Sequence, residues 1–95
     1  MKIEDFKLSL TGSNPPQNIP EYLQALWYDA RGNWHKAHHL IDNLEEKNAC
    51  WVHAYLHRKE GDLSNAGYWY HRAGKKMPEL SLEKEWEMIL EELTS

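Results

Sequence analysis

Histidine is the residue type whose spacing in this chain most directly suggests chemistry. Two pairs of histidines, His35 with His39 and His53 with His57, are each separated by four residues. On a helix this spacing puts both imidazoles on one face, where they can occupy two corners of a zinc site. A carboxylate one turn further on and a histidine from a neighbouring helix would complete three or four ligands. The candidate metal set is His53, His57, Glu60 and His71.

A plainer explanation of these histidines competes with metal binding. The chain has six histidines, so pairs at this spacing arise by chance, and a buried histidine is usually just hydrogen-bonded. The pair His35 and His39 is disfavoured because it falls on the side of its helix opposite the apolar residues. We therefore expect no metal or other cofactor, and keep the set centred on His53 and His57 as the alternative.

Catalytic signatures are sparse. The chain has no glycine-rich phosphate loop and no serine or cysteine in a recognisable nucleophile context. If the helices that carry them pack in parallel, Asp29, His57, Arg58 and Glu60 would converge. A histidine between carboxylates can act as a general base, but such a cluster is more often a polar brace between helices. The brace is the favoured interpretation, and the alternative that the cluster around His53 and His57 is catalytic stays open.

An internal repeat predicts how these side chains are positioned. Residues 21–49 align with 50–78 at an offset of 29 without a gap, which pairs Gly32 with Gly61 and Ala37 with Ala66. A period in this range is typical of helical units that bury their apolar faces by stacking on one another. We therefore expect an all-α protein built from two antiparallel helical hairpins.

Chain breakers and caps predict the boundaries of the helices. Asn18 with Glu21 resembles a capping box, and Gly32 and Gly61 each precede a capping residue, Asn33 or Asp62. Residues 80–94 show helical apolar spacing with a Glu-rich outer face, as expected of a capping helix. The predicted division is an N-terminal arm and Pro-rich linker at 1–17 and one helical domain at 18–95, comprising hairpin 18–45, hairpin 48–77 and capping helix 80–94. The arm either lies against the helices or adds nothing.

Charge excludes some classes of partner. The 95 residues carry a net charge of −4, which argues against a general nucleic-acid or membrane-surface role. The charge sums to −3 over 21–46, +4 over 47–78 and −5 over 79–95. Either acidic neighbours neutralise the middle segment, which is the simpler interpretation, or it presents a basic face to an acidic partner.

Targeting and redox signals point to the cytoplasm. The N-terminus has acidic residues among its apolar ones and does not resemble a signal peptide. No apolar run is long enough to span a membrane. The lone Cys50 excludes an internal disulfide and is expected to behave as a small buried hydrophobe.

The second hairpin resembles a tetratricopeptide repeat. The residues that carry the resemblance, in order, are Gly61, Ala66, Tyr70, Ala73 and Pro78, with Gly32, Ala37 and Ile41 in the first hairpin. The resemblance covers 21–78 and implies hairpins stacked as a right-handed superhelix. The family period is 34 rather than 29, so the superhelix angle is expected to differ. The stretch 53–72 is also similar to small uncharacterised bacterial proteins.

The same resemblance implies a function and a place for it. First helices of the family line a concave face that binds proteins or peptides, at positions that map here to Tyr22, Leu26, Asp29, Trp51, Tyr55 and Arg58. The family's clamp for C-terminal carboxylates uses Lys and Asn, where this chain has Tyr22 and Leu26. We therefore do not expect a receptor for the C-terminal tails of chaperones. We therefore expect a protein- or peptide-binding module, present as a monomer or as a homodimer through an uncapped repeat end. The alternative is that Trp51 and Tyr55 pack inside the molecule.

A second candidate surface lies on the last helix of the repeat. Adjacent helical positions are 100° apart, so the run Tyr68, Trp69 and Tyr70 cannot all face the core. Tyr68 should point outward beside Asn65 and Arg72. The ring either covers the stem of Arg72 or forms an interface contact, since Tyr and Arg commonly anchor interfaces.

Overall fold

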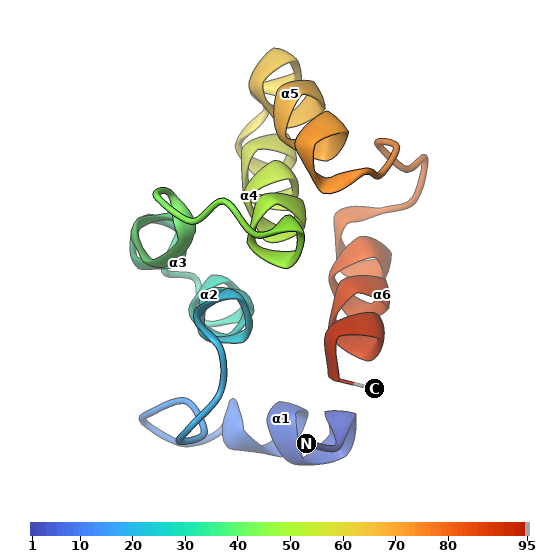
Figure 1. The fold of residues 1–95 in the computed structure, drawn as a ribbon. Helices are drawn as coiled ribbons and strands as arrows, with labels where there is room; N and C mark the ends of the chain where they lie inside the picture. Colours follow the sequence, from blue (N-terminus) through green and yellow to red (C-terminus); the bar gives the residue numbers. More distant parts are fainter. Residues whose placement is uncertain (95) are drawn as a thin grey trace.

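The computed structural model describes residues 1–94, and the regular secondary structure in that range is entirely α-helical, with no strand (Figure 1). The prediction of an all-α protein is therefore confirmed. Its helices are α1 (Ile3–Ser9), α2 (Glu21–Ala30), α3 (Trp34–Ile41), α4 (Lys47–Glu60), α5 (Leu63–Ala73) and α6 (Leu82–Thr94). α2 packs on α3 and α4 packs on α5, while α2 and α3 both contact α4.

The two helix pairs turn by the same local chemistry. Gly32 and Gly61 have φ of 80° and 91°, a left-handed conformation that glycine adopts without the steric penalty of a side chain. The next residue caps the following helix, because Asn33 accepts a hydrogen bond from the backbone N–H of Lys36, and Asp62 one from that of Asn65. These predicted stops and caps are confirmed.

Three predicted boundaries are corrected. Asn18 does not cap α2: the N-cap is Pro20, with no side-chain hydrogen bond, and Asn18 lies in a left-handed turn before it with φ of 62°. α3 ends at Ile41, before the predicted end of the first hairpin at residue 45. α5 ends at Ala73, before the predicted end of the second hairpin at residue 77, because Gly74 terminates it with φ of 72°.

The N-terminal arm forms α1 and lies against the other helices. It runs across one end of the molecule, below α2 and α6 in the view of Figure 1, and contacts α6. Phe6 is fully buried, with its ring centroid 6.2 Å from that of Trp86. The indole N–H of Trp27 donates to Ser9 Oγ at 3.0 Å. The arm therefore closes an apolar end that two hairpins alone would leave open.

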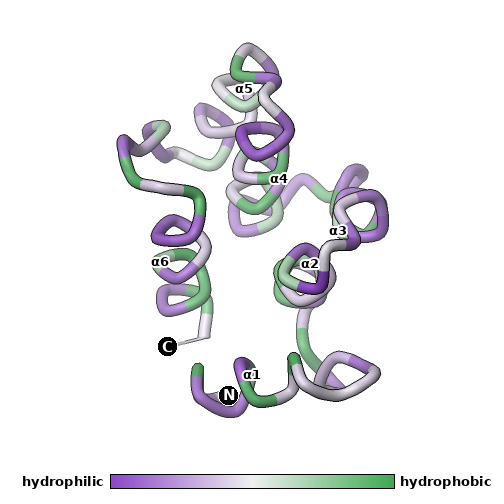
Figure 2. Tube along the Cα trace, turned by 180° about the vertical axis from the view of Figure 1, so that it is seen from behind, coloured by the Kyte–Doolittle hydropathy of each residue, from purple (hydrophilic) through white to green (hydrophobic). Residues whose placement is uncertain are grey.

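α6 packs against both α4 and α2. Ile89 and Leu90 are fully buried in the common core, and the indole N–H of Trp86 donates to the carbonyl of Leu26 at 3.1 Å. Figure 2 shows hydrophobic and hydrophilic residues alternating along the helices, as in amphipathic segments that share one core. None of the helices described has the length and apolar character needed to cross a membrane.

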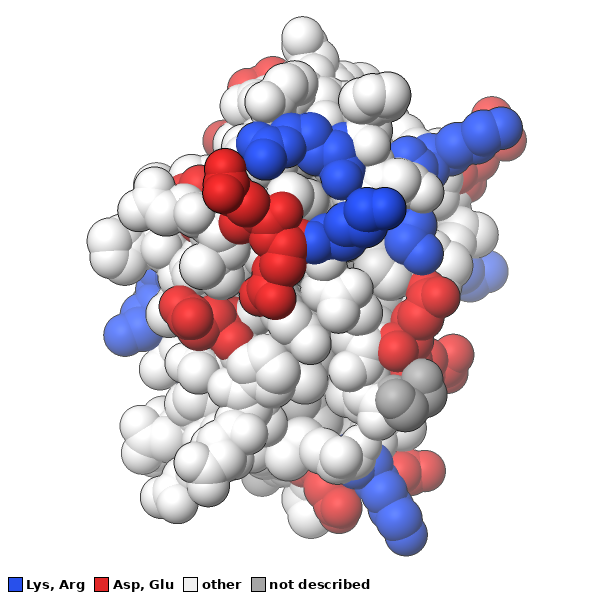
Figure 3. Space-filling model, in the orientation of Figure 1, with Lys and Arg blue, Asp and Glu red and all other residues white. Residues whose placement is uncertain are grey.

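Charged groups on the surface lie close to their opposites. In Figure 3 the Lys and Arg side chains of the upper part of the face lie directly beside Asp and Glu. Ion pairs link the basic middle segment to both acidic neighbours: Arg72 to Glu45 at 3.9 Å, Arg58 to Glu85 at 2.7 Å and Lys75 to Glu92 at 3.6 Å. The simpler interpretation of the charge pattern, neutralisation within the chain, is the one that these pairs support.

Candidate functional site

The predicted partner-binding strip is mostly internal. Leu26 and Asp29 are buried, Trp51 is 4% exposed and Tyr55 is 2% exposed, while Tyr22 and Arg58 are half-buried. The expectation that the two rings form exposed anchors is therefore wrong. The alternative, packing within the molecule, is what the structure has. A lysine ammonium, Lys75 Nζ, lies 4.2 Å from the centroid of the Trp51 ring.

Two residues of that strip nevertheless reach a pocket. It has a volume of about 500 Å³ and lies between the C-terminal end of α2, the second half of α4 and α6. The lining residues are Asp29, Ala30, Tyr55, Lys59, Leu82, Glu83, Trp86 and Glu87. The sequence missed this pocket because half of its lining comes from α6, which lies outside the repeat.

Asp29 forms the polar floor of the pocket. Its Oδ2 accepts a hydrogen bond from the Tyr55 hydroxyl at 3.0 Å, and its Oδ1 is 2.9 Å from Lys59 Nζ. Burial, with the nearby Asp29 charge as the next cause, raises the pKa of Tyr55 well above its ordinary value. The phenol therefore keeps its proton and remains a donor to the carboxylate at all physiological pH values.

A second buried network braces α4, α5 and α6. Glu85 is completely buried; its Oε1 accepts from Arg58 Nη1 at 2.7 Å and its Oε2 from the Tyr70 hydroxyl at 2.5 Å. Arg58 also donates to the carbonyl of Leu80. The predicted convergence of Asp29, His57, Arg58 and Glu60 is thus divided, since Asp29 pairs with Lys59 and Arg58 with Glu85. No single acid–base cluster forms from those four residues.

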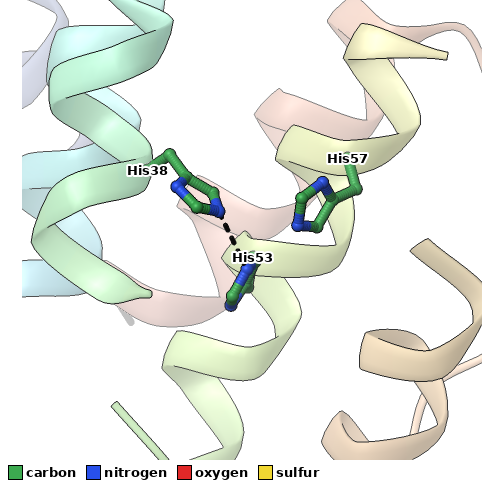
Figure 4. A group of neighbouring side chains, drawn as sticks. All are labelled: His38, His53 and His57. Atoms are coloured by element: carbon green, nitrogen blue, oxygen red, sulfur yellow. Dashed lines mark hydrogen bonds between the residues drawn. The ribbon is translucent and has the colours of Figure 1, made fainter. Parts of the chain in front are cut away.

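Three histidines do meet, although one of them was not predicted. Figure 4 shows His38 from α3 and His53 and His57 from α4 turned toward a common gap. One ring nitrogen of each lies within 4.8 Å of the others, and Nε2 of His38 is 3.1 Å from Nε2 of His53. His71 does not join them, because its side chain is exposed on α5.

The predicted partner Glu60 contacts the group through His57. Nδ1 of His57 is 2.6 Å from Oε2 of Glu60, and a carboxylate can only accept, so Nδ1 carries the proton and Nε2 the lone pair. On the other side of the ring, Nε2 is 3.4 Å from the amide Nδ2 of Asn65. Asp62 completes a second acidic group with His57 and Glu60, in which both carboxylates are exposed.

Two indoles hold the histidine rings in place. The ring of Trp34 stacks on His38 at 5.0 Å between centroids and 8° between planes. Trp69 stacks on His53 at 3.9 Å and 18°. The Trp34 indole N–H donates to the Leu56 carbonyl at 2.8 Å, which ties α3 to α4 beside the cluster.

Burial disfavours the charged form of two of the three histidines, His38 and His53. Burial, followed by repulsion from His38 and His57, lowers the pKa of His53 to about 3, and burial also lowers the pKa of His38. Nδ1 of His53 is buried and has no hydrogen-bond partner within residues 1–94. At neutral pH His38 and His53 are therefore uncharged, which is the form of imidazole that binds metals.

His38 could have been found from helical spacing alone. It is four residues after Trp34 and one after Ala37, a residue of the inward stripe, so it falls at the edge of the face that meets α4. Histidine pairs at i, i+4 do not reveal it, because the residues four positions from His38 are Trp34 and Asp42. His35 and His39, the disfavoured pair, are indeed exposed.

The second candidate surface is partly as predicted. Tyr68 is 55% exposed, while Asn65 and Arg72 are half-buried. The Arg72 guanidinium lies 5.8 Å from the Tyr68 centroid and 4.9 Å from that of Trp69. The arrangement matches the plainer alternative, a tyrosine ring beside the arginine.

Comparison with protein-family models found no match, and neither the curated proteins nor the solved structures contain a significant match to the chain. The resemblance to tetratricopeptide repeats therefore stays a prediction.

Proposed function

We propose that the chain binds a partner protein by taking a lysine or arginine side chain into the pocket between α2, α4 and α6. The observation that carries the proposal is the pocket of about 500 Å³ with a buried carboxylate, Asp29, at its floor. A concave site of this size with a few convergent polar groups and a perturbed titratable residue is where ligands usually bind.

The charge of the lining favours a cation. Three carboxylates, of Asp29, Glu83 and Glu87, face a single ammonium, that of Lys59. The pocket also meets the C-terminal end of α2 at Ala30, where the helix dipole adds partial negative charge. Although Glu87 pairs with Lys7 at 2.7 Å, Glu83 is exposed at the rim.

The remaining lining suits an aliphatic stem. Leu82 and Trp86 form an apolar wall on α6, and the indole hydrogen bond to the Leu26 carbonyl fixes the orientation of Trp86. Lysine and arginine combine such a stem with a charged head. The contact between Lys59 Nζ and Asp29 shows that the floor already accepts an ammonium from within the chain.

An NMR titration with small probes tests the proposal. The probes are the Nα-acetyl methylamides of lysine and arginine, with Nζ-acetylated lysine as a neutral probe of similar stem. We expect the charged probes to shift the Trp86 indole N–H, with a dissociation constant of roughly 1 mM for a ligand of this size. The neutral probe should bind at least tenfold more weakly.

Charge reversal at the rim provides the matched variant. Glu83→Lys should weaken the charged probes, whereas Glu79→Lys, at an exposed acid outside the pocket, should not. Equal binding of charged and neutral probes, or equal loss in both variants, would contradict a cation pocket.

A further inference from the structure

We propose that His38, His53 and His57 form a binding site for a divalent transition-metal ion of the zinc class, held between α3 and α4. The site is separate from the cation pocket, which contains none of these residues. It rests on the convergence of the three rings, the contact of His57 with Glu60 and the packing that holds the rings.

The separations suit one ion. A tetrahedral zinc ion with Zn–N bonds of about 2.0–2.1 Å places its ligand nitrogens roughly 3.4 Å apart. The Nε2 atoms of His38 and His53 are already 3.1 Å apart, and the nitrogen of His57 lies within 4.8 Å of both. For one ion to bind all three rings, the His57 nitrogen has to lie at the same spacing from the other two.

The ligand nitrogen of His57 is selected by Glu60. Because Nδ1 donates to the carboxylate at 2.6 Å, the lone pair resides on Nε2. A metal-bound histidine usually shows this pattern, in which a carboxylate holds the distal N–H and fixes both the tautomer and the ring orientation. Plain aromatic packing has no need of such a partner.

His53 is held with its Nε2 toward His38. Its side chain is 3% exposed, and the stack on Trp69 fixes the ring so that Nε2 lies 3.1 Å from Nε2 of His38. Its other nitrogen, Nδ1, has no hydrogen-bond partner within the described chain and is not one of the ligand atoms. The packing of α5 against α4 therefore positions the ligand nitrogen of His53.

Asn65 can supply a fourth ligand. Its Nδ2 lies 3.4 Å from the lone-pair nitrogen of His57, and a half-turn of the amide exchanges Nδ2 for Oδ1, a metal-binding oxygen. Three imidazoles with one amide oxygen and no thiolate suit zinc and its neighbours cobalt and nickel rather than Cu(I). Cys50 lies elsewhere, with its Sγ 3.6 Å from the Glu45 carbonyl.

Calorimetric titration of the full, untagged and EDTA-stripped chain with zinc chloride at pH 7.5 tests the site. We expect one zinc per chain, no heat with magnesium, and a Co²⁺ derivative with visible absorption bands of a low-coordinate site. His38→Gln should weaken zinc binding by at least tenfold. His39→Gln, at the exposed neighbour on the same helix, should bind as the wild type does.

The same proteins distinguish a site from adventitious binding. Zinc should raise the unfolding temperature of the wild type and of His39→Gln, but not of His38→Gln, because only a native-state ligand stabilises the fold. If His38→Gln does not fold by circular dichroism, Glu60→Gln decides, with an expected loss of 10–100-fold in affinity. Absence of zinc binding to the wild type, or unchanged affinity in the deciding variant, overturns the proposal.

Discussion

The imidazole of His53 lies flat against the indole of Trp69, with ring centroids 3.9 Å apart. This stack joins the middle of α4 to α5 and covers one face of the His53 ring. Since Trp69 also carries the Arg72 guanidinium on its ring, one indole connects the cluster to the outer surface of α5.

Removing that indole should loosen the α4–α5 contact. We expect Trp69→Ala to lower the free energy of unfolding by roughly 1–3 kcal/mol, less than for a fully buried tryptophan because Trp69 is half-buried. Urea unfolding measures the change. Tyr68→Ala, at the adjacent exposed ring, should stay within about 0.5 kcal/mol of the wild type; equal losses would show that the stack contributes nothing particular.

The metal-free fold should lose stability in mild acid. The pKa of His53 is about 3 in the fold and about 6.5 in the unfolded chain, so below pH 6.5 protons bind the unfolded state preferentially. This stabilising contribution is complete above pH 6.5 and is lost as pH falls toward 3. Between pH 7.5 and 5.5 it should decrease by roughly 1 kcal/mol.

His53→Phe is the control for that prediction, because it keeps a stacking ring without a titrating group. Urea unfolding at both pH values, with EDTA present, should show a smaller loss in the variant. An identical pH dependence in the two proteins would exclude His53 as its source.

Lys59 should compete with an external cation for the pocket. Lys59→Met leaves the buried Asp29 carboxylate without its ammonium, which should destabilise the fold by about 1–2 kcal/mol once solvent screening of the half-exposed lysine is allowed for. Butylammonium chloride should recover part of that stability, and potassium chloride at equal ionic strength should not. Lys76→Met, at an exposed lysine, should show neither effect; equal rescue by the two salts would count against the pocket.

Ala66 and its neighbour Gly67 should respond in opposite directions to added bulk. Ala66 is fully buried where α5 packs on α4, so Ala66→Leu should cost roughly 1–3 kcal/mol through overpacking. A Cβ at Gly67 meets nothing within 4 Å, so Gly67→Ala should stabilise the helix by about 0.5–1 kcal/mol. Denaturant unfolding of both variants checks the register of α5, and a neutral Ala66→Leu would contradict it.

The sequence alone determined the features that depend on a few neighbouring residues. The stops at Gly32 and Gly61 and the caps at Asn33 and Asp62 were predictable, because a left-handed φ and an Asx hydrogen bond are settled within one turn of chain. The capping box at Asn18 failed for a related reason. Pro20 takes the N-cap position itself, with extended backbone, and α2 begins directly after it.

Only the tertiary structure decided which faces are covered and what meets across them. Helical periodicity shows which residues share a face, but the helix that covers that face depends on crossing angles and connections set by packing of the whole core. Trp51 and Tyr55 are therefore internal rather than exposed. The pocket beside Asp29 and Tyr55 exists because α6 supplies its other wall. For the same reason His38, from another helix, takes the place that the sequence assigned to His71.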